Sequence, residues 1–102
     1  MKKFSIIFSE SARSDIKDIL DFIEIVCKSP ITAKQYVDGI RKEVNSLSNK
    51  AHIYQIATRK SILKYGHNAR RVNYKKIAII YTIHNDIVVI RRVIPGGTIS
   101  GI

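Results

Sequence analysis

The sequence is nearly without cysteine, and its second half is nearly without acidic residues. Cys27 is the single cysteine of 102 residues, so the chain can form neither an internal disulfide nor a metal cluster built on thiolates. No run of residues is long and apolar enough to span a membrane. The apolar start is interrupted at Ser9, too early for the core of a signal peptide. We therefore expect a cytoplasmic protein without a metal or other cofactor.

The charge of the chain is positive and unevenly distributed. Residues 1–51 contain nine Lys and Arg against seven Asp and Glu, whereas residues 52–102 contain nine against Asp86 alone. The formal charge of +10 therefore comes mainly from the second half. A one-sided positive field attracts polyanions and acidic partners, so nucleic acid and an acidic protein are both open as partners. A surface that serves solubility alone would more commonly mix both signs of charge.

Two amphipathic helices are predicted in the first half. Ser9 or Ser11 can cap the first by accepting a hydrogen bond from a free N–H of its first turn. The Ser29-Pro30 pair is typical of the start of the second, and the short link between the helices predicts an antiparallel hairpin. Asp15 is predicted on the polar face. The apolar stripes are Ala12, Ile16, Ile19, Leu20, Ile23, Val26 and Cys27, then Ala33, Tyr36, Val37, Ile40, Val44 and Leu47.

Four strands complete the predicted domain, which spans residues 1–102. β-branched and aromatic residues indicate strands at 4–8, about 70–74, 77–84 and 87–94, whereas residues 50–69 show no clear pattern. Asn85-Asp86 suits a two-residue hairpin turn, since both residues tolerate positive φ. The order predicts an α+β, β-α-α-β-β-β fold, with the N-terminal helical hairpin packed on one face of a small, mainly antiparallel sheet.

The predicted hairpin turn sets a register that sorts the side chains of the last two strands. It places Ile80 opposite Arg91 and Ile79 opposite Arg92. The face assigned to the helices has Ile77, Ile79, Tyr81, Ile83, Val88, Ile90 and Ile94, with Arg92 at its rim. The face left open has Ala78, Ile80, Thr82, His84, Ile87, Val89, Arg91 and Val93. A bulge in either strand would change this assignment.

Pairs of adjacent basic residues are the candidate binding site. We expect them to gather on the sheet face that the helices leave open, where they would bind nucleic acid or an acidic protein partner. The residues are Arg70, Arg71, Lys75, Lys76 and Arg91.

The order of elements and several short patterns make the chain similar to the RelE/ParE superfamily of toxins from bacterial type II toxin–antitoxin systems. The resemblance covers nearly the whole length. It includes an S-x-x-A-x-x-D-I-x-x-I pattern starting at Ser9, the Ser29-Pro30 helix start and the apolar stripe from Ala33 to Leu47. Late Arg-Val, Ile-Ile-Tyr and Arg-Val-Ile clusters complete it.

The resemblance implies a small cytoplasmic toxin that arrests growth, of the kind found in plasmid-stabilisation modules. A neighbouring gene would encode its acidic antitoxin, which binds the toxin until proteolysis frees it. Two mechanisms occur in the superfamily. RelE-like members are ribosome-dependent, metal-free endoribonucleases that cleave mRNA, whereas ParE-like members poison DNA gyrase and have no nuclease centre.

The sequence departs from the nuclease pattern at two positions. Cleavage by a ribose 2′-hydroxyl needs a base, an acid and cations around the phosphate. Ala78 stands where nuclease members commonly have an arginine, and Pro95-Gly96 stands where many have a histidine and a glycine. Residues 97–102 contain no ionisable side chain. We therefore favour the gyrase inhibitor over the endoribonuclease, and a non-toxic nucleic-acid- or partner-binding module stays as a third alternative.

No catalytic residue is assigned from the sequence. His52, His67 and His84 lie on different predicted elements and are interpreted as solvated polar residues. Tyr81 is interpreted as a core residue whose hydroxyl reaches the rim, and the chain could act as a homodimer or within a toxin–antitoxin hetero-oligomer.

Overall fold

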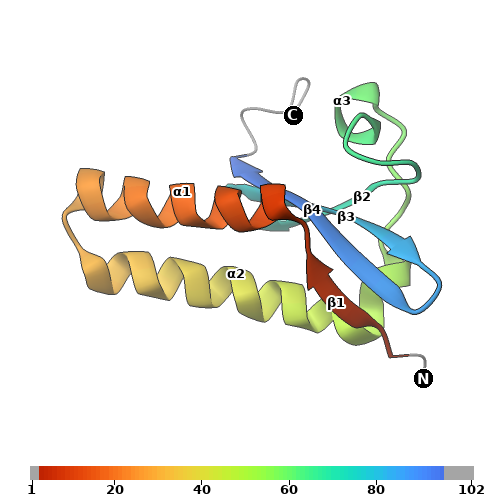
Figure 1. The fold of residues 1–102 in the computed structure, drawn as a ribbon, viewed down its shortest axis with the longest axis horizontal. Coiled ribbons are helices and arrows are strands. Elements are labelled where there is room, and N and C mark those ends of the chain that lie inside the picture. Colours follow the sequence, from red (N-terminus) through yellow and green to blue (C-terminus); the bar gives the residue numbers. More distant parts are fainter. Residues whose placement is uncertain (1–2, 96–102) are drawn as a thin grey trace.

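The fold comes from a computed structural model that describes residues 3–95, apart from the side chain of Cys27. The predictions made for Cys27 and for residues 96–102 therefore lie outside the described residues. The α+β class and the N-terminal helical hairpin are confirmed (Figure 1). The elements in chain order are β1 (Ser5–Phe8), α1 (Glu10–Cys27), α2 (Pro30–Lys50), the 3-10 helix η1 (Ala51–Ile53), α3 (Lys60–Leu63), β2 (Arg70–Tyr74), β3 (Ile77–His84) and β4 (Ile87–Pro95).

Local capping chemistry makes the helical hairpin. The Ser9 hydroxyl accepts a hydrogen bond of 3.0 Å from the N–H of Ala12 and so satisfies a free donor in the first turn of α1. Lys28 ends α1 in the left-handed conformation, with φ of 51°. Ser29 then caps α2, and Pro30 occupies its first turn. A link this short leaves the two helices antiparallel and side by side (Figure 1).

The four strands form one mixed sheet in the order β1-β4-β3-β2. β1 pairs in parallel with β4, and the other pairs are antiparallel. We call the side that packs against α1 and α2 the hairpin face. Its core includes Ile40, Val44 and Leu47 from α2, together with Ile79 and Tyr81 from β3.

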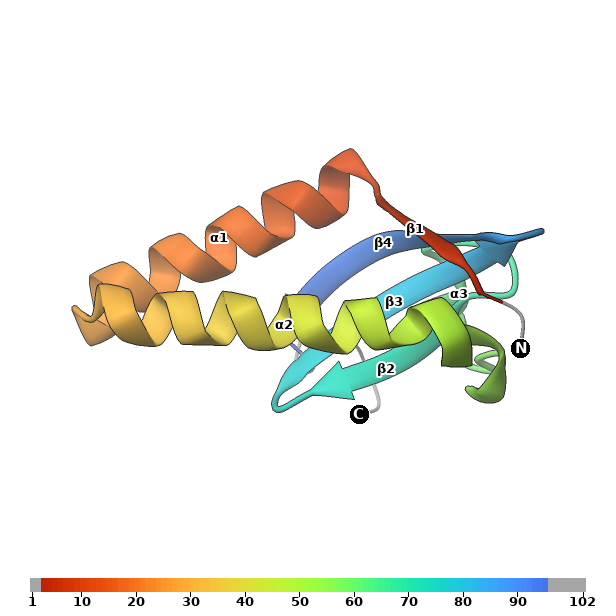
Figure 2. The ribbon, with the colours of Figure 1, turned by 90° about the horizontal axis from the view of Figure 1, so that it is seen from below.

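Residues 57–69, which showed no clear pattern in the sequence, cover the opposite side of the sheet. Ile62 of α3 packs there against Ala78 and Ile80 of β3 in a second, smaller cluster. We call this side the α3 face; the hairpin and α3 lie on opposite sides of the sheet (Figure 2). The loop is tied to the sheet edge by a hydrogen bond of 2.8 Å from the N–H of Ala57 to the carbonyl of Ala69.

A bulge in β4 corrects the predicted register. The pairing holds from the turn, where Asn85 has a φ of 55°, as far as Tyr81 opposite Ile90. It then shifts by one residue, so that Ile80 lies opposite Arg92. Arg91 is therefore an additional residue in β4. Because side chains alternate along a strand, one extra residue moves every later side chain to the other face.

The residues after the bulge lie on the faces opposite to those predicted. Val93 belongs to the hairpin-face core, and Ile94 belongs to the α3-face cluster. Arg92, expected at the rim of the covered face, pairs with Ile80 and its guanidinium lies over the ring of Tyr65, 5.4 Å from the ring centre. Alternation alone gave the reverse assignment because the sequence contains no mark of the bulge.

The tip of the hairpin extends beyond the sheet, as both ribbon views show (Figures 1 and 2). Val26, predicted in the buried stripe, is 59% exposed for this reason. Ile23 is buried, whereas the next three residues, Glu24 to Val26, are exposed. Among the described residues, no helix is apolar over a length sufficient to cross a membrane.

Candidate functional site

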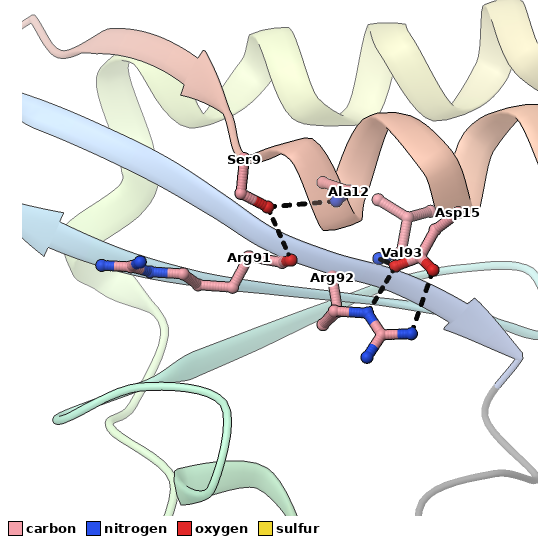
Figure 3. A network of polar contacts seen from close by, with 6 residues as sticks. All are labelled: Ser9, Ala12, Asp15, Arg91, Arg92 and Val93. Carbon is pink, nitrogen blue, oxygen red and sulfur yellow. Dashed lines mark hydrogen bonds and ion pairs between the residues drawn. The ribbon is translucent and has the colours of Figure 1, made fainter.

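The first turns of α1 take the place of β1 along the edge of β4 (Figure 3). β1 pairs with β4 only as far as Ile90. Beyond that point, the Ser9 hydroxyl donates a 2.8 Å hydrogen bond to the carbonyl of Arg91, and a carboxylate oxygen of Asp15 accepts one of 2.9 Å from the N–H of Val93. Side chains of α1 therefore satisfy backbone groups that a longer β1 would have paired.

Asp15 also forms a two-point ion pair with the Arg92 guanidinium, with N···O distances of 2.7 and 3.0 Å. The Asp15 side chain is only 11% exposed. The hydrogen bond to Asp15 raises the pKa of Arg92, and burial partly opposes that effect. The prediction that Asp15 belongs to the polar, outward face of α1 is wrong: the carboxylate joins α1 to β4.

Arg91 lies in a polar network on the α3 face. Its Nε donates to the Thr82 hydroxyl at 3.0 Å, and its Nη2 lies 3.1 Å from Nε2 of His84. The Thr82 hydroxyl is 2.9 Å from the same histidine nitrogen. Because a guanidinium can only donate, Nε2 of His84 is the acceptor in the contact with Arg91. A histidine beside the arginine is a feature that the sequence argument did not assign.

The predicted basic residues do not share one face. Arg70 lies opposite Tyr81, and its Nη1 donates to the carbonyls of His52 and Tyr54 at 2.9 and 2.5 Å. Its neighbour Arg71 lies opposite Ile80 and so belongs to the α3 face. The expectation that all these cations gather on the open face is wrong, since adjacent residues of a strand point to opposite faces.

The other predicted basic residues lie at two further places. Lys75, in the turn after β2, has its ammonium 5.1 Å from the centre of the Tyr36 ring on α2. Lys76 contributes to a groove beside α1. Arg91 shares the α3 face with Arg71. Of the five candidates, Arg71 and Arg91 are therefore the two on a common face.

An apolar surface occupies the tip of the helical hairpin. Phe22 and Ile25 of α1 are 62% and 73% exposed, and Ile31 of α2 is 73% exposed. Phe22 also lines a groove of about 530 Å³ between α1 and the ends of the strands, together with Ile19 and Pro95. Exposed apolar side chains clustered in this way are typical of protein-binding surfaces. The apolar content was visible in the sequence, but the exposure was not.

The described side chains contain no group of three or more His, Cys, Asp or Glu that could hold a metal ion. The polar groups on the α3 face are arginine, threonine and histidine, which suit an anion rather than a cation.

Comparisons with known proteins were made with the sequence and with the structure. A family model described as the ParE toxin of the type II toxin–antitoxin system, parDE, matches residues 6–99. No curated protein matches the sequence. A solved structure of the chromosomal ParDE toxin–antitoxin system from P. aeruginosa has a similar fold, with a TM-score of 0.75 and 15% sequence identity. The match covers 91% of this chain and 96% of that chain.

Proposed function

This chain belongs to the ParE toxin family of type II toxin–antitoxin systems, and we propose that it arrests growth by inhibiting DNA gyrase when no antitoxin is bound. The observation that carries the proposal is the family match over residues 6–99. Inhibition of gyrase requires the protein to act in the cytoplasm. The proposed partner is an acidic antitoxin from a neighbouring gene.

The apolar tip of the helical hairpin is the surface proposed to contact gyrase. The end of the hairpin extends beyond the sheet (Figure 1). Phe22, Ile25 and Ile31 near that end are exposed and could enter a groove on a protein partner. Aromatic and large aliphatic side chains commonly provide most of the binding free energy in protein interfaces. A binding poison needs such a surface and needs no catalytic group of its own.

A supercoiling assay with purified gyrase tests this proposal. The variant with Phe22→Ser and Ile25→Ser is expected to inhibit at least tenfold less strongly, because a large side chain lost from an interface centre costs more than about 1.4 kcal/mol. Ile53→Ser is the matched control, since Ile53 is 63% exposed but lies away from the tip. If the tip variant still inhibits gyrase and the Ile53→Ser control does not, the tip is not the surface that contacts gyrase.

The antitoxin is proposed to cover the α3 face. Arg71 and Arg91 lie there, and acidic side chains of the partner would neutralise them. We expect Arg71→Glu with Arg91→Glu to weaken antitoxin binding and toxicity together, measured by co-purification and by growth after induction. If antitoxin binding and toxicity are both unchanged, the α3 face is not the antitoxin-binding surface. Substitution of Lys75 and Lys76 by Gln is the comparison, because both lie elsewhere.

Endoribonuclease activity is the second candidate, and His84 is the observation that favours it. Its Nε2 lies 3.1 Å from Nη2 of Arg91, so an imidazole and a cation for phosphate lie together on the α3 face. Induced expression distinguishes the candidates. Cleaved transcripts in a translating extract, lost in His84→Gln, support the nuclease. Double-strand DNA breaks with intact transcripts support the gyrase poison, and absence of growth arrest supports a non-toxic binding module.

A further inference from the structure

The segment around α3 is a cationic surface without an acidic residue. Residues 44–85 contain no Asp or Glu. In the part from 58 to 71, the exposed residues are all polar, and Arg59, Lys60 and Lys64 are among them. The apolar residues of this segment, such as Ile62, are turned to the sheet and are buried. The buried side holds the segment in place, and the cations are left on its outer side.

Arg59 and Arg71 come from separate parts of the chain and lie on the same side of the sheet. Arg59 precedes α3, and Arg71 lies on β2 with its Nε donating a 2.8 Å hydrogen bond to the amide oxygen of Asn73. Burial lowers the pKa of Arg71, and the positive charge of Arg59 lowers it further. No described carboxylate lies within ion-pair distance of either guanidinium. Like charges on one surface would be stabilised by a bound anion.

The loop that carries Arg59 is fixed before any ligand binds. Ile56 forms a β-bridge with Arg70, whose own guanidinium binds the carbonyls of His52 and Tyr54. Downstream, the N–H of Ala69 donates to the carbonyl of Gly66. The backbone before α3 is therefore tied to the sheet edge, and a turn closes the segment after α3. A backbone that is already held in place loses less conformational entropy on binding than a mobile loop would.

We propose that Arg59 and Arg71, with Lys60 and Lys64 beside them, form a binding site for the phosphodiester backbone of a nucleic acid. Lys60 and Lys64 are four residues apart across one helical turn and so share a side of α3. Guanidinium groups bind phosphate oxygens through two parallel hydrogen bonds. Interfaces with nucleic acid are polar and strongly positive, whereas the cores of protein interfaces are depleted in lysine. The chemistry of this surface therefore fits nucleic acid, which would compete with the proposed antitoxin for Arg71.

The inference goes beyond the proposed function and does not depend on it. Binding is measured on the purified chain alone, so a failed gyrase assay leaves the result unaffected. If gyrase inhibition and nucleic-acid binding are both observed, the toxin would contact gyrase with the hairpin tip and a DNA segment with the α3 face.

Fluorescence anisotropy with a labelled duplex DNA of about two helical turns, and with a single-stranded RNA of similar length, tests the site. Each phosphate contact contributes about 0.9 to the slope of log K against log salt for duplex DNA. Arg59→Gln with Arg71→Gln is therefore expected to reduce the slope by about 2 and the affinity roughly tenfold or more. The RNA arm shows which polymer binds more tightly through the same residues.

The matched control is Arg13→Gln with Arg41→Gln, which removes two exposed arginines from α1 and α2. It changes the net charge by the same amount, so a general charge effect would appear equally in both variants. An equal loss in the two variants, or no binding by the unaltered chain, overturns the proposal. The pair Lys60→Gln and Lys64→Gln repeats the test on two exposed lysines. Thermal melting of each variant verifies folding.

Discussion

The tip of the helical hairpin and the segment around α3 are both exposed, but they expose opposite chemistry. At the tip, apolar residues such as Phe22 and Ile31 face solvent. Around α3, the apolar Ile62 is buried against the sheet and the exposed residues are polar or cationic. The difference arises because the sheet extends under α3 but does not reach the end of the hairpin (Figure 1). α3 has a layer to pack against, whereas the end of the hairpin extends beyond its layer.

The comparison shows that the two surfaces suit different classes of partner. The tip suits a protein groove, because its burial would remove large apolar side chains from water. The α3 segment suits a polyanion, because its free energy on binding would come from phosphate contacts and counterion release. If the same side chains served both folding stability and binding, substituting them would weaken both properties together. If the tip contributes to binding alone, substitutions there should leave the free energy of unfolding unchanged.

The largest effect is expected from Ile40→Ala in the middle of α2. Ile40 is fully buried against the sheet, and its truncation should lower the free energy of unfolding by about 3 kcal/mol. Ile31→Ala, on the same helix but 73% exposed, should change it by less than about 0.5 kcal/mol. Urea denaturation measures both. A large loss at Ile31 would mean that the tip is packed in solution, and the comparison would fail.

Asp15→Ala should lower the free energy of unfolding by about 2 to 3 kcal/mol, because it leaves Arg92 and the N–H of Val93 without their partner. Asp18 lies three residues further along the same helix and is exposed. Asp18→Ala should therefore leave the free energy of unfolding almost unchanged. Hydrogen exchange should also accelerate in the first turns of α1 in the Asp15 variant. Equal stability of the two variants would show that the polar contacts at β4 do not hold the hairpin.

The next effect concerns the end of α2, where the hydroxyl of Tyr81 donates a 2.6 Å hydrogen bond to the carbonyl of Ala51. Burial raises the pKa of Tyr81, so the folded state keeps its proton at a pH where the unfolded state loses it. The contribution of Tyr81 to the free energy of unfolding is fully present below about pH 10. Above that pH it falls by about 1.4 kcal/mol per pH unit.

Urea denaturation from about pH 9 to pH 11 measures this dependence. Tyr81→Phe should be less stable at neutral pH by about 1 kcal/mol, with a shallower alkaline fall. An alkaline slope equal to that of the unaltered chain would contradict the role of the Tyr81 proton.

The smallest effect is expected at Gly39, where α2 passes Tyr74 of β2. A Cβ at this position would overlap the Tyr74 phenol, whose ring stacks edge-on against Tyr36 at 5.6 Å. Gly39→Ala should therefore destabilise the chain by about 1 kcal/mol. In a Tyr74→Ala background, the same change should stabilise by up to about 1 kcal/mol through helix propensity. A gain in both backgrounds would show that Tyr74 moves freely and does not fix the approach of α2.

Much of the fold could be predicted because its signals are local. Ser9, the Ser29-Pro30 pair and the helical spacing of apolar residues define the hairpin, and Asn85-Asp86 defines the last turn. The strands found at 70–74 and 77–84 agree with the predicted ones. Residues 50–69 could not be assigned, because a single turn of helix held by contacts such as those of Ile62 gives no periodic pattern.

The candidate sites were less accessible to sequence reasoning. The adjacency of Arg70 and Arg71 suggested a shared surface, yet strand alternation separates them. Arg59 was not among the candidate residues, because it shares a side of the sheet with Arg71 only after α3 folds onto the sheet. His84 was set aside as a solvated residue, although its place on the face of Arg91 was already given by the predicted register.

The sequence by itself determined the order of the elements, the caps of the helices and the excess of positive charge in the second half. Each of these depends on residue type and on neighbours within a few positions. The tertiary structure alone decided that Arg91 is an additional residue in β4 and that Asp15 is bound to Arg92. It also decided which apolar residues face solvent at the hairpin tip. These features depend on how far the helices reach past a sheet formed by distant strands, and spacing along the chain contains no record of that distance.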